Sequence, residues 1–196
     1  RAVLMRRGIN DLDQAKQWLT PSALPPADEH FPGLQPAVTR LIAACQSGET
    51  LAICGDYDAD GMTSTALLIR ALQPLGARPV AAIPSRMDDG YGLNVRMVEE
   101  LHQQGVRLLV TVDNGVAAEA ALARAKDLDV QVIITDHHTI PDPPPQALAL
   151  LHPATTPVDS PYRGLAGVGL AYVLARSLAE ALEKPEAIAS ARDLFC

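Results

Sequence analysis

Cysteine and long apolar runs are scarce in this chain. Its 196 residues include three cysteines, Cys45, Cys54 and Cys196, and no CxxC pair. This spacing excludes a disulfide framework of the secreted type and a cysteine-rich zinc site, so we expect a reducing compartment, the cytoplasm. No apolar run approaches the roughly 18 residues that a membrane-spanning helix needs, and no signal peptide is visible, so we expect no membrane partner.

Positive charge and aromatic side chains are also in short supply. The formal net charge is −7, the sequence pI is about 5.1, and aromatic residues make up 4% of the chain. A role in nucleic-acid binding therefore cannot be argued from a basic surface, and a phosphate-bearing substrate would have to be held locally by metal ions and selected arginines. Hydrophobic residues make up 48% of the chain, which is ample for the core of one domain.

Short apolar runs of strand character alternate with helix-like stretches from residue 36 onward. We expect strands at Leu51–Cys54, Pro79–Ile83, Leu108–Val112, Val130–Thr135 and Ala147–Leu151, and helices at Pro36–Gln46, Thr63–Leu75, Asn94–Gln104, Ala117–Leu128 and Leu165–Leu182. This alternation predicts an α/β fold, a doubly wound and mostly parallel sheet of about five strands with helices on both faces. Residues 1–35, with one helix at Asp11–Leu19 and a proline-rich connector, should form an N-terminal extension to the domain at residues 36–196.

Acidic and histidine residues directly follow several of these expected strands. They are Asp56, Asp58 and Asp60 in one motif, Asp113 in a second, Asp136, His137 and His138 in a third, and His152 after the last strand. Because the carboxyl ends of parallel strands share one edge of a sheet, these side chains should converge. Two like charges at about 4 Å repel by roughly 4 kcal/mol at an effective dielectric constant near 20, and divalent cations would relieve this repulsion. Mixed carboxylate and imidazole ligands favour Mn²⁺, with Mg²⁺ as the competitor.

The motif Asp56–Gly61 has three other interpretations. Its acids match the start of an EF-hand loop, but Leu67 stands where that loop requires glutamate, and a strand precedes the motif where a helix should. An aspartyl-phosphate nucleophile usually has Thr or Val four residues later, and neither Asp56 nor Asp58 does. A turn that only caps the next helix needs one aspartate, and this motif has three. Metal binding is therefore favoured.

The second and third acidic motifs differ in how specific they are. Asp113-Asn114-Gly115 by itself is equally typical of an ordinary turn. A histidine pair directly after Asp136 at a strand end is more typical of metal ligands. Adjacent side chains of an extended segment point in opposite directions. Hence either the chain turns there, or one histidine binds the metal while the other contacts the substrate or supports a ligand.

Two glycine-containing loops could contact phosphate. In Ser85–Gly92, Arg86 offers a bidentate fork, although an ordinary connection between strand and helix is nearly as consistent with the sequence. Gly164–Gly169 has the spacing of a dinucleotide-binding motif, but it does not follow the first strand and lacks the acidic residue at a strand end about 20 residues later. Close packing of the next helix on the sheet is the favoured interpretation, and phosphate contact at its N-terminus is the second.

Taken together, the three acidic motifs resemble those of the DHH phosphoesterase superfamily. The matching segments are GDYDADGMTSTAL at 55–67, TVDNG at 111–115 and TDHH at 135–138. Within the superfamily the chain is most similar to the RecJ family of bacterial single-strand-specific exonucleases, on the segments MRRGI at 5–9, PSRMDDGYGLN at 84–94 and YRGLAGVGLAYVLA at 162–175. The resemblance spans nearly the whole chain, and the combination of motifs is more specific than any one of them.

The resemblance implies a role for each matching residue. The implied metal ligands are Asp56, Asp58, Asp60, Asp113 and His137, the catalytic residues are Asp136 and His138, and the substrate-binding residue is Arg86. It further implies two divalent cations, Mn²⁺ favoured and Mg²⁺ possible, and hydrolysis of phosphodiester bonds of single-stranded DNA from its 5′ end, in DNA repair and recombination. Single-strand-binding protein and a helicase would be partners by the same resemblance.

The resemblance also has departures and leaves alternatives. A fourth metal-binding motif would begin about where this chain ends, with Asp193 as its lead-in, so we expect a fragment that is weakly active or inactive alone. Another enzyme of the superfamily, acting on short oligonucleotides, a nucleoside bisphosphate or a cyclic dinucleotide, is the enzymatic alternative. A non-catalytic replication scaffold of the same fold is the other, and the intact Asp58, Asp60, Asp113 and His137 argue against it.

Overall fold

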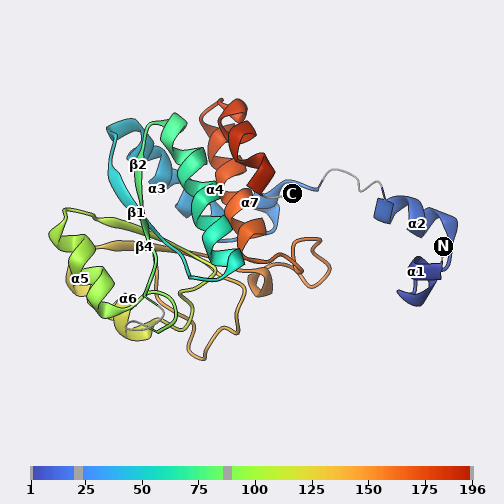
Figure 1. Ribbon diagram of the computed structural model, residues 1–196, viewed down its shortest axis with the longest axis horizontal. Coiled ribbons are helices and arrows are strands. Elements are labelled where there is room, and N and C mark those ends of the chain that lie inside the picture. The colour runs from blue at the N-terminus through green and yellow to red at the C-terminus, as the bar shows by residue number, and fades with distance from the viewer. Residues whose placement is uncertain (1, 20–23, 86–89, 195–196) are drawn as a thin grey trace.

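Five short strands form one parallel sheet in the order β2-β1-β3-β4-β5 (Figure 1). The strands are β1 (Thr50–Cys54), β2 (Arg78–Ala82), β3 (Leu108–Val112), β4 (Gln131–Thr135) and β5 (Ala149–Leu151). The computed structural model describes residues 2–19, 24–85 and 90–194. Within these ranges every pair of neighbouring strands is parallel, so the predicted fold class is confirmed.

Helices cover both faces of the sheet (Figure 1). One face carries α3 (Leu34–Ser47), α4 (Ala59–Leu75) and α7 (Gly167–Ala181), and the other carries α5 (Val95–Gln103) and α6 (Glu119–Asp127). Each group of helices shares its own cluster of buried aliphatic side chains with the sheet. A 3-10 segment, η3 (Pro185–Leu194), packs against α4. The sheet is therefore doubly wound, as predicted.

The central strands are buried over most of their length, and this burial explains why their positions could be predicted. All five residues of β3 are buried. A parallel strand covered by helices on both faces has no solvent side, so its sequence is a continuous apolar run without alternation. The edge strand β2 is more exposed, and its start is shifted by one residue from the prediction, to Arg78.

The N-terminal helices α1 (Ala2–Arg6) and α2 (Leu12–Leu19) lie away from the sheet (Figure 1). The carboxylate of Asp11 accepts the N–H of Gln14 at 2.8 Å, which starts α2 as expected, whereas α1 was not predicted. Nearer the sheet, the hydroxyl of Tyr162 donates to the carbonyl of Pro25, and its ring packs edge-on against Phe31. These contacts attach the segment containing η1 (Ala27–Glu29) to the loop that precedes α7.

The connection from β4 to β5 is the one crossover in the described sheet that contains no helix. Its prolines, at 141 and 143–145, lie in a segment without helix or strand, because proline lacks the N–H donor that these structures need. β5 nevertheless pairs parallel to β4, and η2 (Pro153–Thr155) follows it. Among the described residues no helix combines the length and the apolar character needed to traverse a bilayer.

Candidate metal centre

The first acidic motif forms the turn between β1 and α4. The carboxylate of Asp58 accepts the N–H of Gly61 at 2.9 Å and caps α4, which therefore begins at Ala59 and not at the predicted Thr63. This earlier start places Asp60 in the first turn of the helix. A capping role thus accounts for Asp58 and for neither of the other two aspartates of the motif.

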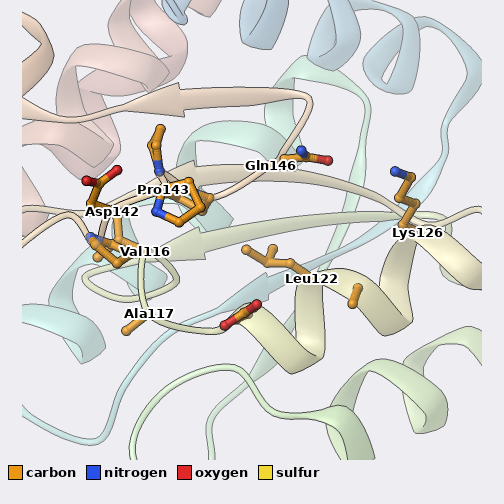
Figure 2. Close-up of a pocket in the computed structure, with 12 residues that line it drawn as sticks. Val116, Ala117, Leu122, Lys126, Asp142, Pro143 and Gln146 are labelled. Carbon is orange, nitrogen blue, oxygen red and sulfur yellow. The ribbon is translucent and has the colours of Figure 1, made fainter.

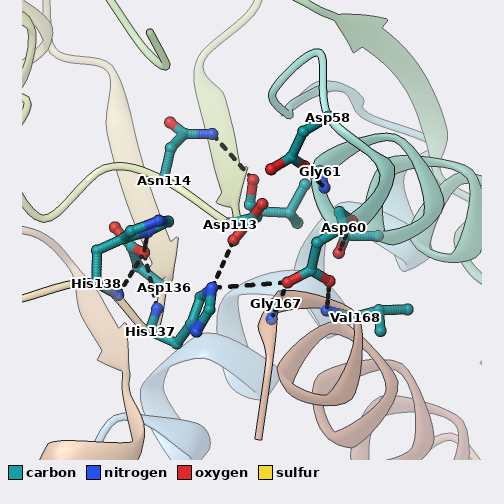
Figure 3. Close-up of polar contacts among 12 residues, drawn as sticks. Asp58, Asp60, Gly61, Asp113, Asn114, Asp136, His137, His138, Gly167 and Val168 are labelled. Carbon is teal, nitrogen blue, oxygen red and sulfur yellow. Dashed lines mark hydrogen bonds and ion pairs between the residues drawn. The ribbon is translucent and has the colours of Figure 1, made fainter.

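Asp60 joins α4 to the N-terminus of α7. Its two carboxylate oxygens accept the main-chain N–H groups of Gly167 and Val168, both at 2.7 Å (Figure 3). Its Oδ2 also lies 3.6 Å from Nε2 of His137. Because each carboxylate oxygen has two lone pairs, these bonds fix the group in place and leave it able to bind a cation.

Asp56 is fully buried, and both of its carboxylate oxygens lack a hydrogen-bond partner. Burial raises the pKa of Asp56, and the charge of Asp58 raises it further. The nearby main-chain N–H groups of Tyr57 and Gly92 lower the pKa, although neither makes a hydrogen bond of good geometry to the carboxylate. A buried polar group without a partner costs free energy, and in a native structure it calls for an explanation such as a bound ion. Asp56 therefore fits a metal ligand.

Asp113 follows β3 in a left-handed backbone conformation, with φ at 62°. Its side chain is 2% exposed, and its Oδ1 lies 2.9 Å from Nε2 of His137 (Figure 3). The contact lacks the geometry of a hydrogen bond, so Oδ1 joins the two oxygens of Asp56 as a buried carboxylate oxygen without such a partner. Burial above all, then the charges of Asp60 and Asp58, raise the pKa of Asp113 to about 8. The carboxyl group is thus held in conditions that oppose its charged form.

Asn114 ties the strand ends together. Its Nδ2 donates to the carbonyl of Cys54 at 3.0 Å and to that of Val112 at 2.9 Å, while its Oδ1 accepts the N–H of Leu93 at 3.1 Å. These buried contacts join the end of β1, the end of β3 and the segment before α5. The sequence predicts only a turn at Asn114, because two of its three partners, Cys54 and Leu93, are distant in the chain.

Asp136 organises the turn after β4. Its Oδ2 accepts the N–H of Val116 at 3.0 Å, and its Oδ1 accepts those of His137 at 2.7 Å and His138 at 3.1 Å. Oδ1 also lies 2.7 Å from Nδ1 of His138. Because the chain turns here, the rings of His137 and His138 lie close, with 4.7 Å between their centroids. Of the two arrangements left open by the sequence, the turned backbone is the one observed.

His138 lies between Asp136 and Tyr91. The hydroxyl of Tyr91 donates to the carbonyl of Asp113 at 2.8 Å and lies 3.2 Å from Nε2 of His138. Since that hydroxyl proton is already engaged, the second contact is a hydrogen bond when Nε2 carries a proton. Burial favours the neutral ring, but the hydrogen bond and charge of Asp136, then the charges of Asp113 and Asp58, outweigh it and raise the pKa of His138. An imidazolium with both ring protons satisfies both neighbours.

His152 supports the same turn from the end of β5. Its Nδ1 accepts the N–H of Ala154 at 3.0 Å, and its Nε2 lies 2.7 Å from the carbonyl oxygen of His138. A carbonyl can only accept, so the ring is the neutral tautomer with its proton on Nε2. Burial, the largest cause, lowers the pKa of His152, which keeps this tautomer. His152 therefore acts on the site through the main chain of His138.

The arrangement fits a divalent cation. One ligand atom from each of Asp113, His137 and His138 lies within 4.8 Å of the others. Carboxylate oxygens and imidazole nitrogens together suit Mn²⁺, and the oxygens alone suit Mg²⁺. The buried oxygens of Asp56 and Asp113 that lack hydrogen bonds are groups that a cation would satisfy. The structure brings all the predicted acids to one edge, while their individual roles as ligands stay predictions.

Arg86, predicted to bind phosphate, lies outside the described residues, and the cavity beside α6 lies apart from the predicted metal ligands. A cavity of about 440 Å³ lies between α6 and Pro141–Pro145, and Val116, Leu122 and Lys126 are among its lining residues (Figure 2). None of the predicted metal ligands lines this cavity. The predicted metal centre at the strand ends is therefore separate from this cavity.

Tyr91 is a residue that sequence reasoning missed. It is 49% exposed, contacts Asp113 and His138 as described, and packs edge-on against Tyr57 with 6.3 Å between ring centroids. One indication of its importance was present in the sequence, because Tyr91 lies in the segment 84–94, which is among those that carry the family resemblance. Its contacts could not be read from that segment, because they join three separate strand ends.

Known proteins share this sequence pattern. Residues 50–194 match the protein family described as DHH family, N-terminal domain. The single-stranded-DNA-specific exonuclease RecJ of Escherichia coli (strain K12) is 40% identical over 151 residues, which cover 76% of this chain and 26% of that protein. RecJ of Thermus thermophilus is 41% identical over 155 residues, which cover 78% of this chain and 22% of that protein. The chain thus spans about a quarter of the length of the curated relatives it matches.

Solved structures share the fold as well. A crystal structure of exonuclease RecJ bound to manganese aligns with a TM-score of 0.78 and 39% identity, over 89% of this chain and 43% of that one. A crystal structure of RecJ from Thermus thermophilus in complex with Mn²⁺ aligns with a TM-score of 0.77 and 35% identity, over 98% of this chain and 26% of that one. The segment that matches the family runs from β1 through η3 and makes up most of the chain, so the chain belongs to the DHH family.

Proposed function

We propose that the whole protein is a metal-dependent exonuclease that hydrolyses phosphodiester bonds of single-stranded DNA from the 5′ end, in DNA repair and recombination. The observation that carries the proposal is the set of buried carboxylate oxygens that lack hydrogen bonds, both oxygens of Asp56 and Oδ1 of Asp113, the last of which lies beside His137. The identity of about 40% to exonucleases named as specific for single-stranded DNA supports the substrate.

The proposed metal ligands are Asp56, Asp58, Asp60, Asp113 and His137. When bound, Mn²⁺ or Mg²⁺ would supply positive charge to the phosphate oxygens and lower the pKa of an attacking water. Asp113 would give up its proton as the cation binds, since a coordinating carboxylate is charged. Residues 36–196 would form the catalytic domain, and residues 1–35 would be an extension to it.

His138 is the proposed proton donor to the leaving 3′ oxygen. Its raised pKa keeps the ring protonated at neutral pH more than an ordinary histidine would be, and Asp136 holds its Nδ1 side. The oxygens of Asp136 already accept from four protein donors. The catalytic role predicted for Asp136 would therefore be exerted through His138. Arg86 would bind a phosphate of the substrate.

The test uses the protein at its natural length. We expect Mn²⁺-dependent release of a labelled mononucleotide from a 5′-labelled single strand, none from the blunt duplex of the same sequence, and none after chelation with EDTA. The matched control is Asp113→Asn, which keeps the side-chain shape and should be inactive. Cleavage of dinucleotides by a protein that ignores long single strands would overturn the proposal in favour of a short-oligonucleotide enzyme.

The proposed partners follow from the same activity. A single-strand-specific exonuclease needs single strands to be exposed, so a helicase would supply its substrate and single-strand-binding protein would cover the exposed strand. We place this work in the cytoplasm. Affinity measurements between the purified natural-length protein and single-strand-binding protein would check the second of these contacts, and failure to bind at micromolar concentration would remove that partner.

A further inference from the structure

The glycine-rich segment before α7 is a motif that the proposed chemistry does not yet use. The sequence of Gly164–Gly169 favours close packing of a helix on the sheet, with phosphate contact as the second interpretation. We infer that the first turn of α7 is a positioning element of the metal centre, which orients the carboxylates of Asp60 and Asp113 towards a shared cation. This inference rests on the proposed function, since it concerns the same site.

The first supporting observation is where the N–H groups of this turn point. Those of Gly167 and Val168 donate to the two oxygens of Asp60, at 2.7 Å each (Figure 3). Two hydrogen bonds to one carboxylate fix both its position and the plane of the group, and the helix dipole favours a negative charge there. These two donors are occupied, so they are not the phosphate-binding groups that the sequence left open. Their role is to hold a predicted ligand.

The second observation concerns the space at Gly167 and is independent of the hydrogen bonds. A Cβ at this position would lie 2.7 Å from Cβ of Asp113 and 3.0 Å from its Oδ1. Asp113 cannot easily retreat, because its N–H is bonded to the carbonyl of Thr135 at 2.9 Å and its Oδ1 faces His137 at 2.9 Å. The absence of a side chain at Gly167 is therefore required for the helix end to approach the carboxylate.

Together the two contacts fix the distance between two proposed ligands. Nε2 of His137 lies 2.9 Å from Oδ1 of Asp113 and 3.6 Å from Oδ2 of Asp60, so the three groups surround one small space (Figure 3). The start of α7 is hydrogen-bonded to Asp60 and lies so close to Asp113 that even a Cβ at Gly167 would not fit between them. A cap that served only helix stability would need a bond to Asp60 but no contact with Asp113. The double contact points to positioning of the ligands.

The test compares two alanine substitutions within the same motif. In Gly167→Ala the new methyl group pushes against Asp113, whereas in Gly164→Ala it meets nothing within 4 Å. Mn²⁺ affinity is measured by calorimetry on the natural-length protein, and thermal unfolding of the metal-free protein is recorded alongside. We expect Gly167→Ala to weaken Mn²⁺ binding by about 10- to 100-fold, the usual effect of losing support for a ligand, and Gly164→Ala to leave it unchanged.

A third variant covers the case in which Gly167→Ala does not fold. Val168→Pro removes one donor to Asp60 and keeps Gly167, and proline is tolerated in the first turn of a helix because those N–H groups have no partner within it. We expect it to weaken Mn²⁺ binding by about tenfold. Wild-type affinity in either folded variant overturns the inference. If the unsubstituted protein binds no Mn²⁺, the proposed function fails first, and the two failures are thus distinguishable.

Discussion

The sheet has an amino edge, where its parallel strands begin, and a carboxyl edge, where they end. The two edges differ in how their charged groups are paired. At the amino edge, the guanidinium of Arg40 makes two hydrogen bonds of 2.7 Å to the carboxylate of Glu49, and its Nε donates to the side chain of Gln131. At the carboxyl edge, Asp56 and Asp113 keep buried oxygens without hydrogen bonds. The first edge pairs opposite charges, and the second gathers like charges with histidines.

This difference shows which edge is organised for stability and which for chemistry. A paired network satisfies its own hydrogen bonds and needs no ligand. A cluster of carboxylates with a raised pKa opposes folding until a cation binds, and strongly shifted groups of this kind gather at functional sites. The left-handed backbone at Asp113 adds strain at the same place. The charged groups of the carboxyl edge therefore lower the stability of the metal-free fold, whereas those of the amino edge contribute to it.

The largest effect is expected from Asp113→Asn at the carboxyl edge. The substitution removes a proposed ligand, so activity with Mn²⁺ should fall by at least about 10³-fold. The metal-free protein should keep or gain thermal stability at pH 8, because the amide carries no charge to bury and asparagine tolerates a positive φ. Exonuclease assays and thermal unfolding measure the two effects. A large loss of stability together with the loss of activity would contradict this account.

The second prediction concerns the pH dependence of stability without metal. Asp113 has a pKa of about 8 in the folded chain against 3.8 for an ordinary aspartate, so the folded state retains a proton that the unfolded state releases. The free energy of unfolding should therefore fall as the pH rises from about 4 to about 8, by up to a few kcal/mol.

Urea unfolding of the metal-free protein at several pH values checks this slope. Asp113→Asn is the matched control, because it removes the titrating group and keeps the shape, so the part of the slope due to this residue should vanish in the variant. Equal slopes in both proteins would show that Asp113 is charged at neutral pH. Mn²⁺ affinity should rise over the same pH range, since the ligand must lose its proton.

The third prediction separates the two bonds of His152. Asparagine places its Oδ1 near the position of the histidine Nδ1, so His152→Asn should keep the bond from Ala154 and lose the donor to His138. We expect kcat to fall by about tenfold with little change in KM, because the turn that holds His138 is loosened. His152→Ala loses both bonds and should also lower stability, by about 1 kcal/mol. Steady-state kinetics and thermal unfolding distinguish the variants, and unchanged kcat in both would remove His152 from the site.

The contrast between the edges also explains what could be predicted from the sequence. The central strands are continuous apolar runs because helices cover them on both faces, so their positions and their parallel order could be expected. The convergence of the acidic residues could also be predicted, because each follows a strand and the carboxyl ends of parallel strands lie at one edge of the sheet. The start of α4 was predicted four residues too late, at Thr63 instead of Ala59, because the cap by Asp58 depends on local backbone geometry.

The contacts within the site could not be predicted in the same way. Asp60 meets Gly167 across more than a hundred residues of chain, and Tyr91 reaches Asp113 and His138 from a loop. Such pairs depend on the packing of helices against the sheet and leave no local pattern. The resemblance to the DHH family pointed to the segments that contain these residues, but not to which side chains touch.

The smallest effect is expected at the amino edge, where Arg40→Met should affect stability alone. The side chain of Arg40 is 18% exposed, so removal of its charge leaves Glu49 partly buried without its bidentate partner, at a cost of about 1 to 2 kcal/mol. Arg176→Met is the control, because its pair with Glu180 is half exposed and should change stability by at most about 0.5 kcal/mol. Mn²⁺ affinity should match the unsubstituted protein in both variants, since neither arginine contacts the metal centre. A change in Mn²⁺ affinity in Arg40→Met would show that the two edges are coupled through β1 and β4, and the division between a stabilising and a reactive edge would then be wrong.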